Sequence, residues 1–235
     1  MDLHWHHETT STNDEAKALA EQGASHGTLV GADFQTAGRG RTGKSWLSNP
    51  GDGLMCSIIV RPTWEKAHWG WIALTAGLAL AELLERDCLH PAIKWPNDIL
   101  VNGRKIAGIL TEAAGDYAII GIGMNLNMAT LPTVDSSIQP TSFFLETDCT
   151  LDARSYAETI QTLLSYYTAL PSPSALQSKI EKRLAWYHST ISLRSGDQYH
   201  TGTIAGLGTL GQLLLNTPSG TTEIYDAHEI RPLSA

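Results

Sequence analysis

The 235-residue sequence has few cysteines, no block of like charge and no secretory signal. Cys56, Cys88 and Cys149 are odd in number, widely spaced and without a C-x-x-C pair, so neither a disulfide framework nor a cysteine zinc site is predicted. The first residues lack the basic and apolar regions that a secretory signal requires. We therefore expect a reduced, cytoplasmic protein.

Long apolar runs and excess positive charge are also missing. The longest apolar stretch, residues 69–84, is interrupted by Gly70, Thr75, Gly77 and Glu82. It falls short of the roughly 18 apolar residues that a membrane span needs. The formal net charge of −8 argues against indiscriminate nucleic-acid binding. With 42% hydrophobic residues, the chain is long enough to bury a substantial core, and we expect no membrane partner.

Two short motifs imitate known sites but lack the required surroundings. Residues 38–45 match the phosphate-loop pattern G-x-x-x-x-G-K-[ST], which works only where a helix begins at its end. Residues 46–53 are instead dense in helix breakers, so a phosphate loop is rejected. His4, His6 and His7 have no fourth metal ligand at a suitable spacing, which favours a solvated or strand-terminal role.

Apolar periodicity predicts a mixed α and β domain over residues 1–187 and a small all-β domain over 188–235. Thr12 and Glu15 form a capping-box pattern for a first helix, which Gly23 ends. Further helices are predicted over 65–86, 151–169 and 174–186, and strands over 28–34, 54–60, 99–101, 105–110 and 117–127. Short strands predicted at 190–194, 199–205, 212–216 and 222–225 suggest a barrel.

A glycine-rich loop at residues 35–53 gathers positive charge in an otherwise acidic chain. It contains Arg39, Arg41 and Lys44 interleaved with glycines. A solvated turn is one interpretation. Backbone N–H groups and guanidinium groups that converge on one anion are the other, and we favour a loop that orders over a phosphate or carboxylate.

The Asn102-Gly103 pair predicts a hairpin with a two-residue turn. In that register Val101 opposes Arg104, Leu100 opposes Lys105 and Asp98 opposes Ala107. Alternation then places Ile99, Val101 and Ile106 on a core face, with Asp98, Leu100, Lys105 and Ala107 on the other face.

Asp98 and Lys105 become diagonal neighbours in this hairpin, roughly 7–8 Å apart at the backbone and within side-chain reach. They form either a structural ion pair or a pair that meets one ligand. Gly108 favours the ligand, because glycine inside a strand often marks close approach of another molecule or backbone.

Six motifs, taken together, resemble the biotin protein ligases. They are S11-T-N13, Q35-T-A-G-R-G-R41, K94-W-P-N-D98, R104-K-I-A-G-I-L110, G121-I-G-M-N125 and T141-S142, in family order across most of residues 10–145. The resemblance implies an α+β catalytic domain like that of class II synthetases and biotin–lipoate ligases, with a mixed β-sheet flanked by helices. It also implies that the C-terminal β-barrel is SH3-like.

The family reaction has two steps. Biotin and MgATP give biotinyl-AMP, and a lysine of a biotin carboxyl carrier protein then takes the biotinyl group. The resemblance implies that Mg²⁺ is carried mainly by the nucleotide. It leaves the oligomeric state open, with a homodimer as one alternative.

The resemblance also assigns roles to residues of this sequence. Lys105, Asp98 and Arg41 would be catalytic. Biotin would contact Ser11, Thr12, Asn13, Gln35, Gly38, Arg39, Arg41, Lys105 and Gly108. ATP would contact Arg39, Gly40, Arg41, Trp46, Lys94, Asn97, Asn125 and Ser142. Trp46 would shield the nucleotide, although a buried core tryptophan is an equal alternative.

The sequence departs from the family pattern in two places. The usual loop reads G-R-G-R-R-G-R, whereas Thr42 and Lys44 stand at its fifth and seventh positions, which predicts weaker retention of the intermediate because Lys lacks the guanidinium fork. The S-T-N motif begins at residue 11, which leaves no room ahead of it for a helix-turn-helix domain. We therefore expect no DNA partner and no repressor activity.

Two other functions stay open at this point. A lipoate ligase shares the fold and the adenylation chemistry, although the K-W-P-N-D and R-K-I-A-G-I-L motifs favour biotin. A biotin sensor without enzymatic activity is the second, and the presence of Lys105 and Asp98 argues against it.

Overall fold

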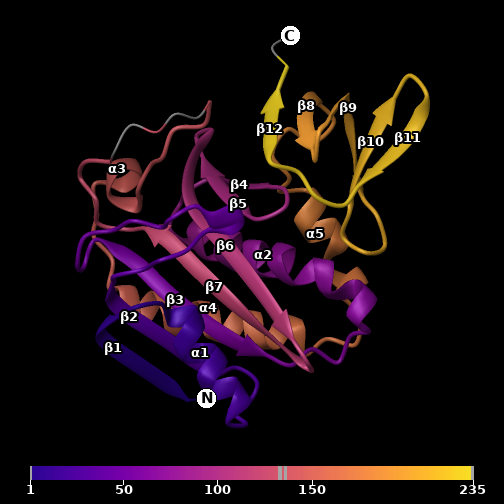
Figure 1. Cartoon of the computed structure of the whole chain (residues 1–235). Helices are drawn as coiled ribbons and strands as arrows, with labels where there is room; N and C mark the ends of the chain where they lie inside the picture. The colour runs from indigo at the N-terminus through magenta and orange to yellow at the C-terminus, as the bar shows by residue number, and fades with distance from the viewer. Residues whose placement is uncertain (1, 132–133, 135–136, 234–235) are drawn as a thin grey trace.

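A seven-stranded mixed sheet forms the larger part of the molecule (Figure 1). The computed structural model describes residues 2–131, 134 and 137–233. The strand order is β1-β2-β3-β7-β6-β5-β4, in which β1 runs parallel to β2 and the other neighbours are antiparallel. The strands are β1 (Leu3–Thr9), β2 (Leu29–Gln35), β3 (Gly53–Val60), β4 (Pro91–Lys94), β5 (Asp98–Val101), β6 (Arg104–Ala114) and β7 (Tyr117–Asn125).

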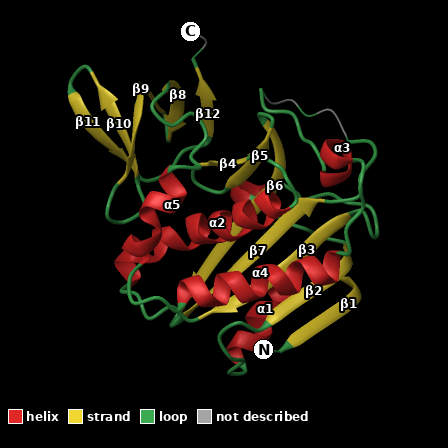
Figure 2. Cartoon of the chain, turned by 180° about the vertical axis from the view of Figure 1, so that it is seen from behind, coloured by secondary structure: helices red, strands yellow, loops and turns green. Residues whose placement is uncertain are grey.

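Helices cover both faces of this sheet. On one face lie α2 (Trp71–Arg86), which follows the 3-10 turn η2 (Lys66–Gly70), and α4 (Ala153–Thr168), while α1 (Thr12–Glu21) packs on the other face (Figure 2). All eight residues of β3 are buried, because α4 covers one side of the strand and α1 the other. A strand buried on both faces needs a nearly continuous apolar run, which residues 54–60 supply with Ser57 as the one polar residue. A short helix α3 (Phe143–Thr147) lies at the sheet's end.

The segment Lys66–Arg86 is long and apolar enough to cross a membrane by length and composition alone. However, 67% of its most apolar window is buried within the protein. Leu74, Leu78 and Leu80 of α2 are almost fully buried in the main hydrophobic core. The apolar character of this segment is therefore accounted for by its place as the central core helix.

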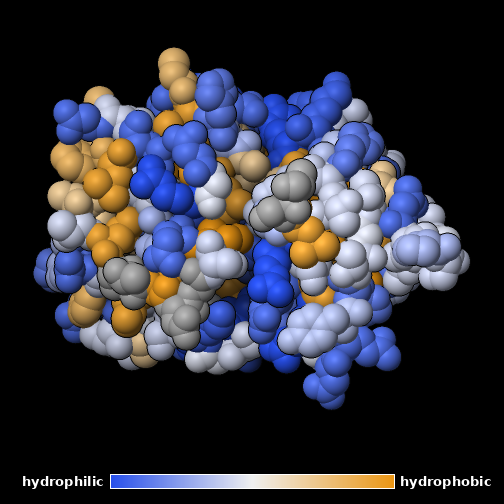
Figure 3. Space-filling view, turned by 90° about the horizontal axis from the view of Figure 1, so that it is seen from above, coloured by the Kyte–Doolittle hydropathy of each residue, from blue (hydrophilic) through white to orange (hydrophobic). Residues whose placement is uncertain are grey.

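A five-stranded antiparallel sheet follows, in the region predicted to be all β, but the sequence predicted four of its strands and not the fifth, at residues 229–232. Its order is β11-β10-β9-β8-β12, and the strands are β8 (Thr190–Ser195), β9 (Gln198–Leu207), β10 (Leu213–Thr217), β11 (Gly220–Ile224) and β12 (Glu229–Pro232). We call residues 190–232 the C-terminal module. Two indole N–H groups attach it, since Trp71 donates to the Thr209 carbonyl at 2.9 Å and Trp95 to the Gly211 carbonyl at 3.0 Å. Seen from above, hydrophilic residues gather in a band between the two parts (Figure 3).

The helix predicted over 174–186 is wrong in its length. The chain forms a 3-10 turn η3 (Pro173–Leu176) and a short helix α5 (Gln177–Glu181). It then leaves the helix because Ile93 of β4 donates to the Arg183 carbonyl at 2.6 Å and accepts from the Ala185 amide at 2.9 Å. Pairing with a sheet edge therefore replaces the last helical turn that periodicity alone predicts.

Candidate active site

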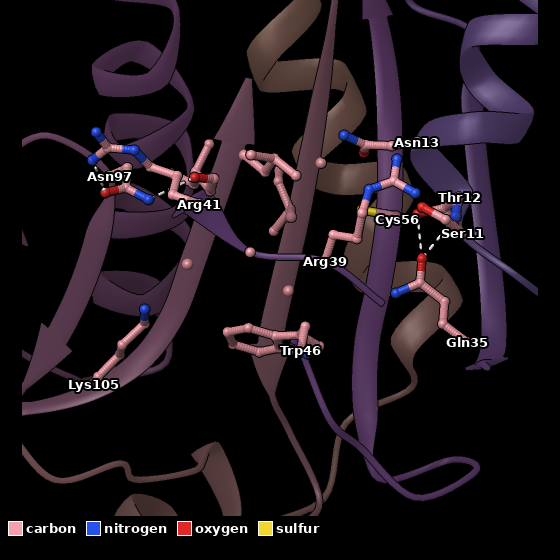
Figure 4. Close-up of a pocket in the computed structure, with 17 residues that line it drawn as sticks. Ser11, Thr12, Asn13, Gln35, Arg39, Arg41, Trp46, Cys56, Asn97 and Lys105 are labelled. Atoms are coloured by element: carbon pink, nitrogen blue, oxygen red, sulfur yellow. Dashed lines mark hydrogen bonds between the residues drawn. The ribbon is translucent and has the colours of Figure 1, made fainter. Parts of the chain in front are cut away.

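A small cavity lies on the α1 side of the sheet, between β2, β3, β6 and β7 (Figure 4). Its volume is about 60 Å³. Most of the residues predicted from the sequence line it, namely Ser11, Thr12, Asn13, Gln35, Arg39, Gly40, Arg41, Trp46, Asn97, Lys105 and Gly108. Side chains far apart in the sequence therefore converge on one space, as expected of a ligand site.

One wall of the cavity is built where α1 begins. The Oε1 atom of Gln35 accepts from the Thr12 amide at 2.7 Å and from the Thr12 hydroxyl at 3.0 Å. The capping-box prediction is wrong, because Ser11 rather than Thr12 is the N-cap residue and makes no side-chain cap. Glu15 instead accepts from the Thr9 hydroxyl at 2.8 Å. Thr12 is thus freed from helix capping and faces Gln35.

Behind this wall lies a buried polar network that sequence reasoning missed. The Ser57 hydroxyl on β3 lies 2.7 Å from the Thr12 hydroxyl and 2.6 Å from Asn13 Oδ1. The Asn13 amide nitrogen donates to Glu112 of β6 at 2.5 Å. Fully satisfied polar networks of this kind fix side-chain orientation, so Asn13 and Thr12 are held from below.

The loop between β2 and β3 folds into a narrow hairpin over the cavity. Trp46 N donates to the Gly38 carbonyl at 2.9 Å, and Gly40 N donates to the Lys44 carbonyl at 2.6 Å. A 3-10 turn over Arg41–Gly43 closes the tip, with no helix at the end of the phosphate-loop pattern. The rejection of a phosphate loop is confirmed. Thr42 takes a positive φ of 55°, which is strained for a β-branched residue.

The two loop arginines point in different directions, each toward a carboxylate. Figure 4 shows Arg39 extending toward Asn13 and Arg41 toward Asn97. Arg39 forms a two-pronged hydrogen bond with Asp14 at 2.7 and 2.6 Å, and this bond lowers the pKa of the Asp14 carboxyl despite partial burial. Arg41 Nη1 donates to Asn97 Oδ1 at 3.0 Å, and its Nη2 donates to the carboxylate of Asp226 in the C-terminal module.

Trp46 packs against two glycines on the cavity floor. A Cβ atom at Gly123 of β7 would lie 2.5 Å from the indole ring, and one at Gly108 of β6 would lie 3.3 Å from it. The Lys105 ammonium stands 5.9 Å from the ring centroid, at cation–π distance. The indole Nε1 is buried and has no hydrogen-bond partner among the described residues. Trp46 is therefore a wall of the site rather than a residue of the main core.

The β5–β6 hairpin has the predicted turn but a different register beyond it. Val101 pairs with Arg104 and Leu100 with Lys105, as predicted, but a bulge then places Asp98 opposite Gly108 rather than Ala107. The extra residue also ends the predicted alternation, and the chain buries Ile99, Leu100, Val101, Ile106 and Ala107 alike. Bulges redirect side chains in this way beside functional sites.

Asp98 joins two lysines beneath the cavity. Its Oδ1 lies 2.5 Å from Lys105 Nζ, and its Oδ2 accepts from Lys94 Nζ at 2.9 Å. Burial acts to raise the pKa of the Asp98 carboxyl, but attraction from Lys105 and Lys94, with their hydrogen bonds, outweighs it and leaves that pKa below its ordinary value. The predicted proximity of Asp98 and Lys105 is confirmed, and Asp98 is held as a carboxylate.

Five predicted residues do not line the cavity: Gly38, Lys94, Asp98, Asn125 and Ser142. The Asn125 amide donates to the Thr141 carbonyl at 2.8 Å. The Ser142 hydroxyl donates to the Met128 carbonyl at 2.6 Å and caps α3 by accepting from the Leu145 amide at 3.1 Å. Both side chains are buried and join the chain segment after β7 to the sheet. Their predicted contact with ATP stays a prediction.

Other cavity residues were not named as site residues from the sequence: Cys56, Ile109, Leu110, Gly121, Ile122 and Gly123. Cys56 is fully buried, and burial raises the pKa of its thiol to about 12, so it is an unreactive part of the wall. Gly121 and Gly123 alternate along β7 and therefore share one face. Two glycines separated by one residue in a strand are therefore the sequence signal for a cavity floor that carries no side chains.

Residues 6–125 match the sequence model of the Biotin/lipoate A/B protein ligase family. This match covers the sheet from residue 6 of β1 onward and every residue that lines the cavity. The chain belongs to this family. The resemblance read from its motifs is thereby confirmed, and the protein is a ligase.

Comparisons with individual proteins agree with this membership. The ligase is 32% identical to the bifunctional ligase/repressor of Bacillus subtilis over 96% of this chain and 72% of that protein. It is 31% identical to the biotin–[acetyl-CoA-carboxylase] ligase of Paracoccus denitrificans, over 94% of this chain and 97% of that one. The structure of biotin protein ligase from Aquifex aeolicus in complex with biotin and ATP superimposes with a TM-score of 0.85, at 28% identity, over 100% of this chain and 99% of that chain.

The contact between Trp46 and Gly123 leads to a first prediction. Gly123→Ala places a methyl group 2.5 Å from the indole ring, so Trp46 must move out of its position. We expect a change in near-ultraviolet circular dichroism and a loss of about 1–3 kcal/mol in the free energy of unfolding. Gly40→Ala, where φ is −112° and the nearest contact is 3.4 Å, serves as the control. Equal effects of the two variants would contradict the packing described.

The lowered pKa of Asp98 leads to a second prediction. Asp98→Asn removes the charge shared by two lysines, and we expect the free energy of unfolding at pH 7 to fall by about 1–3 kcal/mol. The ordinary pKa of an aspartate carboxyl is 3.8, and that of Asp98 in the folded protein is lower. As the pH falls below 3.8 toward that lower value, Asp98 of the wild type becomes protonated. The difference in unfolding free energy between wild type and variant should therefore shrink. Urea titrations at several pH values measure this difference.

Asp116→Asn is the matched control, since that carboxylate pairs with Arg61 but is 81% exposed. We expect little change in its unfolding free energy. A difference for Asp98→Asn that stays constant between pH 7 and pH 2 would refute the assignment of a stabilising charge.

Proposed function

We propose that this ligase activates biotin with MgATP and transfers the biotinyl group to a lysine of a biotin carboxyl carrier domain. In the first step a biotin carboxylate oxygen attacks the α-phosphorus of ATP, the bond to the β-phosphate breaks, and pyrophosphate leaves with the electron pair. In the second step the neutral lysine amine attacks the carbonyl carbon, the bond from that carbon to the phosphate oxygen breaks, AMP leaves with the electron pair, and the nitrogen releases a proton to solvent. The observation that carries the proposal is the convergence of Gln35, Arg41 and Lys105 on one cavity in a member of this family.

The polar wall at α1 suits the neutral ureido ring of biotin. That ring presents N–H donors and a carbonyl acceptor, and a dry pocket must satisfy both. The amide oxygen of Gln35 is taken by Thr12, which leaves the amide nitrogen to donate to a ligand. Ser11, Thr12 and Asn13 supply further polar groups at the same wall.

The cations suit the charge that develops in the first step. A carboxylate that attacks a phosphate must overcome like-charge repulsion, and fixed cations lower that cost. Lys105 is 34% exposed, faces the cavity and is anchored by Asp98, so its ammonium is placed to lie between carboxylate and α-phosphate. Arg39 and Arg41 stand on the loop above. We infer that magnesium enters with ATP as part of the substrate.

For the second step we propose that Asp98 orients the incoming amine rather than removing its proton. Its lowered pKa makes the carboxylate a weak base. Its two oxygens already hold two ammonium groups, Lys94 and Lys105, in the ligand-free protein. The same carboxylate can accept a hydrogen bond from the neutral substrate amine, once that amine has released its extra proton to solvent.

The loop must open to admit both substrates. A cavity of about 60 Å³ is far smaller than the roughly 300–1,000 Å³ typical of small-molecule sites. The hairpin of residues 38–46 is joined to its surroundings by the packing of Trp46 and by half-exposed ion pairs such as Arg39–Asp14. We infer that this loop moves to enlarge the site, because the strands that line the rest of the cavity are paired within the sheet.

A transfer assay tests the proposal. An apo biotin carboxyl carrier domain is incubated with the ligase, biotin and MgATP, and its intact mass is measured. We expect a gain of one biotinyl group that requires ATP and does not occur when the acceptor lysine is replaced by Arg. A parallel reaction with lipoate discriminates the related activity of the family.

Lys105→Ala should lower the transfer rate by about 100-fold or more, with biotin binding largely kept, because the cation is needed mainly as charge develops. Unchanged turnover would refute the role of Lys105. Transfer of lipoate would show that the substrate is lipoate and not biotin. Biotin binding without transfer or pyrophosphate–ATP exchange would indicate a sensor.

We also propose that these 235 residues have no repressor activity. Residues 3–9 form strand β1 of the catalytic sheet, and the net charge of −8 opposes contact with DNA. In a gel-shift assay with the operator of a bifunctional ligase/repressor relative, we expect no complex in the presence of biotin and MgATP. Saturable, sequence-specific binding would overturn this expectation.

A further inference from the structure

The C-terminal module reaches into the active site through one carboxylate. Asp226 lies in the segment between β11 and β12, and its carboxylate accepts a hydrogen bond from Arg41 Nη2 on the loop above the cavity. Arg41 and Asp226 are 185 positions apart in the sequence. The catalytic loop therefore contacts the second sheet as well as the first.

Arg41 is held from two sides by this arrangement. Its Nη1 donates to Asn97, whose own amide nitrogen donates to the Ile109 carbonyl at 2.7 Å and is thereby fixed to β6. A guanidinium has five N–H donors, so the bonds to Asn97 and Asp226 leave three for a ligand. Because two of its N–H groups already hold the Arg41 side chain in place, little rotamer freedom is lost when the remaining N–H groups bind a ligand.

We propose that Asp226 is a positioning residue of the C-terminal module that holds Arg41 over the cavity and so slows the loss of biotinyl-AMP. The inference rests on the proposed function for the identity of the intermediate. It assigns the module a direct part in the site, through a residue that does not itself touch the substrate.

The neighbours of Arg41 on the loop give it little support. Residue 42 is an uncharged threonine and residue 44 is an exposed lysine, so neither offers Arg41 a negatively charged partner. The basic side chains that face Asp226 are those of Arg41 and His228, and His228 Nε2 lies 3.8 Å from the second carboxylate oxygen. The carboxylate thus offers one oxygen to the loop and keeps the other on its own segment.

The first measurement uses the ligand-free protein. Hydrogen–deuterium exchange of peptides that cover residues 38–46 is compared between wild type and Asp226→Ala. We expect faster exchange in the variant, because the loop loses one of its two side-chain anchors. Asp197→Ala is the matched control, since Asp197 is an exposed acid in the β8–β9 turn of the same module, and it should exchange like wild type.

The second measurement follows release of preformed biotinyl-AMP in the presence of excess unlabelled biotin. In Asp226→Ala we expect release to be about twofold to fivefold faster, the size typical of a half-exposed charge-assisted pair. Asp226→Asn keeps an acceptor oxygen and should show a smaller increase. In an Arg41→Ala background, Asp226→Ala should add nothing, because the residue acts through Arg41.

Unchanged exchange or unchanged release in Asp226→Ala would overturn the inference, as would an equal further effect in the Arg41→Ala background. Failure of the wild-type protein to form biotinyl-AMP would overturn the proposed function and this inference with it. The exchange comparison would then report on the contact between the loop and the module alone, so the two failures are distinguishable.

Discussion

The ion pair between Asp98 and Lys105 is the contact on which the geometry of the site depends. A lysine that faces a small cavity beside an indole ring would otherwise turn toward solvent, and Asp98 holds its ammonium at 2.5 Å. The bulge in the β5–β6 hairpin makes the contact by moving Asp98 opposite Gly108, where no side chain intervenes. Lys94 shares the same carboxylate, so net positive charge remains at this edge after pairing. Asp98 thus anchors the Lys105 ammonium, while the remaining positive charge can still attract an anionic ligand.

The same solution recurs at each cation of the site. Arg39 is held by Asp14 of α1, and Arg41 by Asp226 of the C-terminal module. These carboxylates come from three separate parts of the fold, whereas the cations come from one loop and one hairpin. An acidic chain can therefore display cations to an anionic ligand, because each cation is oriented by a local partner. Exposed ion pairs of this kind add little to the free energy of unfolding, so their main contribution is to hold the cationic side chains in position.

The sequence predicts the features that depend on residues close together in the chain, and it does not predict those that depend on residues far apart. Turn chemistry at Asn102-Gly103 and the apolar run of β3 are local signals, and both were predicted correctly. Glu15 appeared to complete a capping box, but Thr9 binds it, and that contact requires β1 to lie beside α1. Strand β4 has four residues, and the parallel strand β1 is largely polar, so neither shows a clear pattern. Ser57 and Glu112 likewise support Asn13 only because the folded sheet brings β3 and β6 against α1, which is distant from both in sequence.

Asp226 shows the same limit most clearly, and it changes how the molecule is divided. From the sequence, the C-terminal module is a small β domain with no chemistry of its own. The structure attaches it by two indole hydrogen bonds on one side, one of them buried, and by the Arg41 contact on the other. The first attachment fixes the module against α2 and β4, and the second transmits that fixed position to the loop. The module can hold the loop in place only if it is itself attached to the catalytic domain, so the hydrogen bonds of Trp71 and Trp95 support the contact between Asp226 and Arg41.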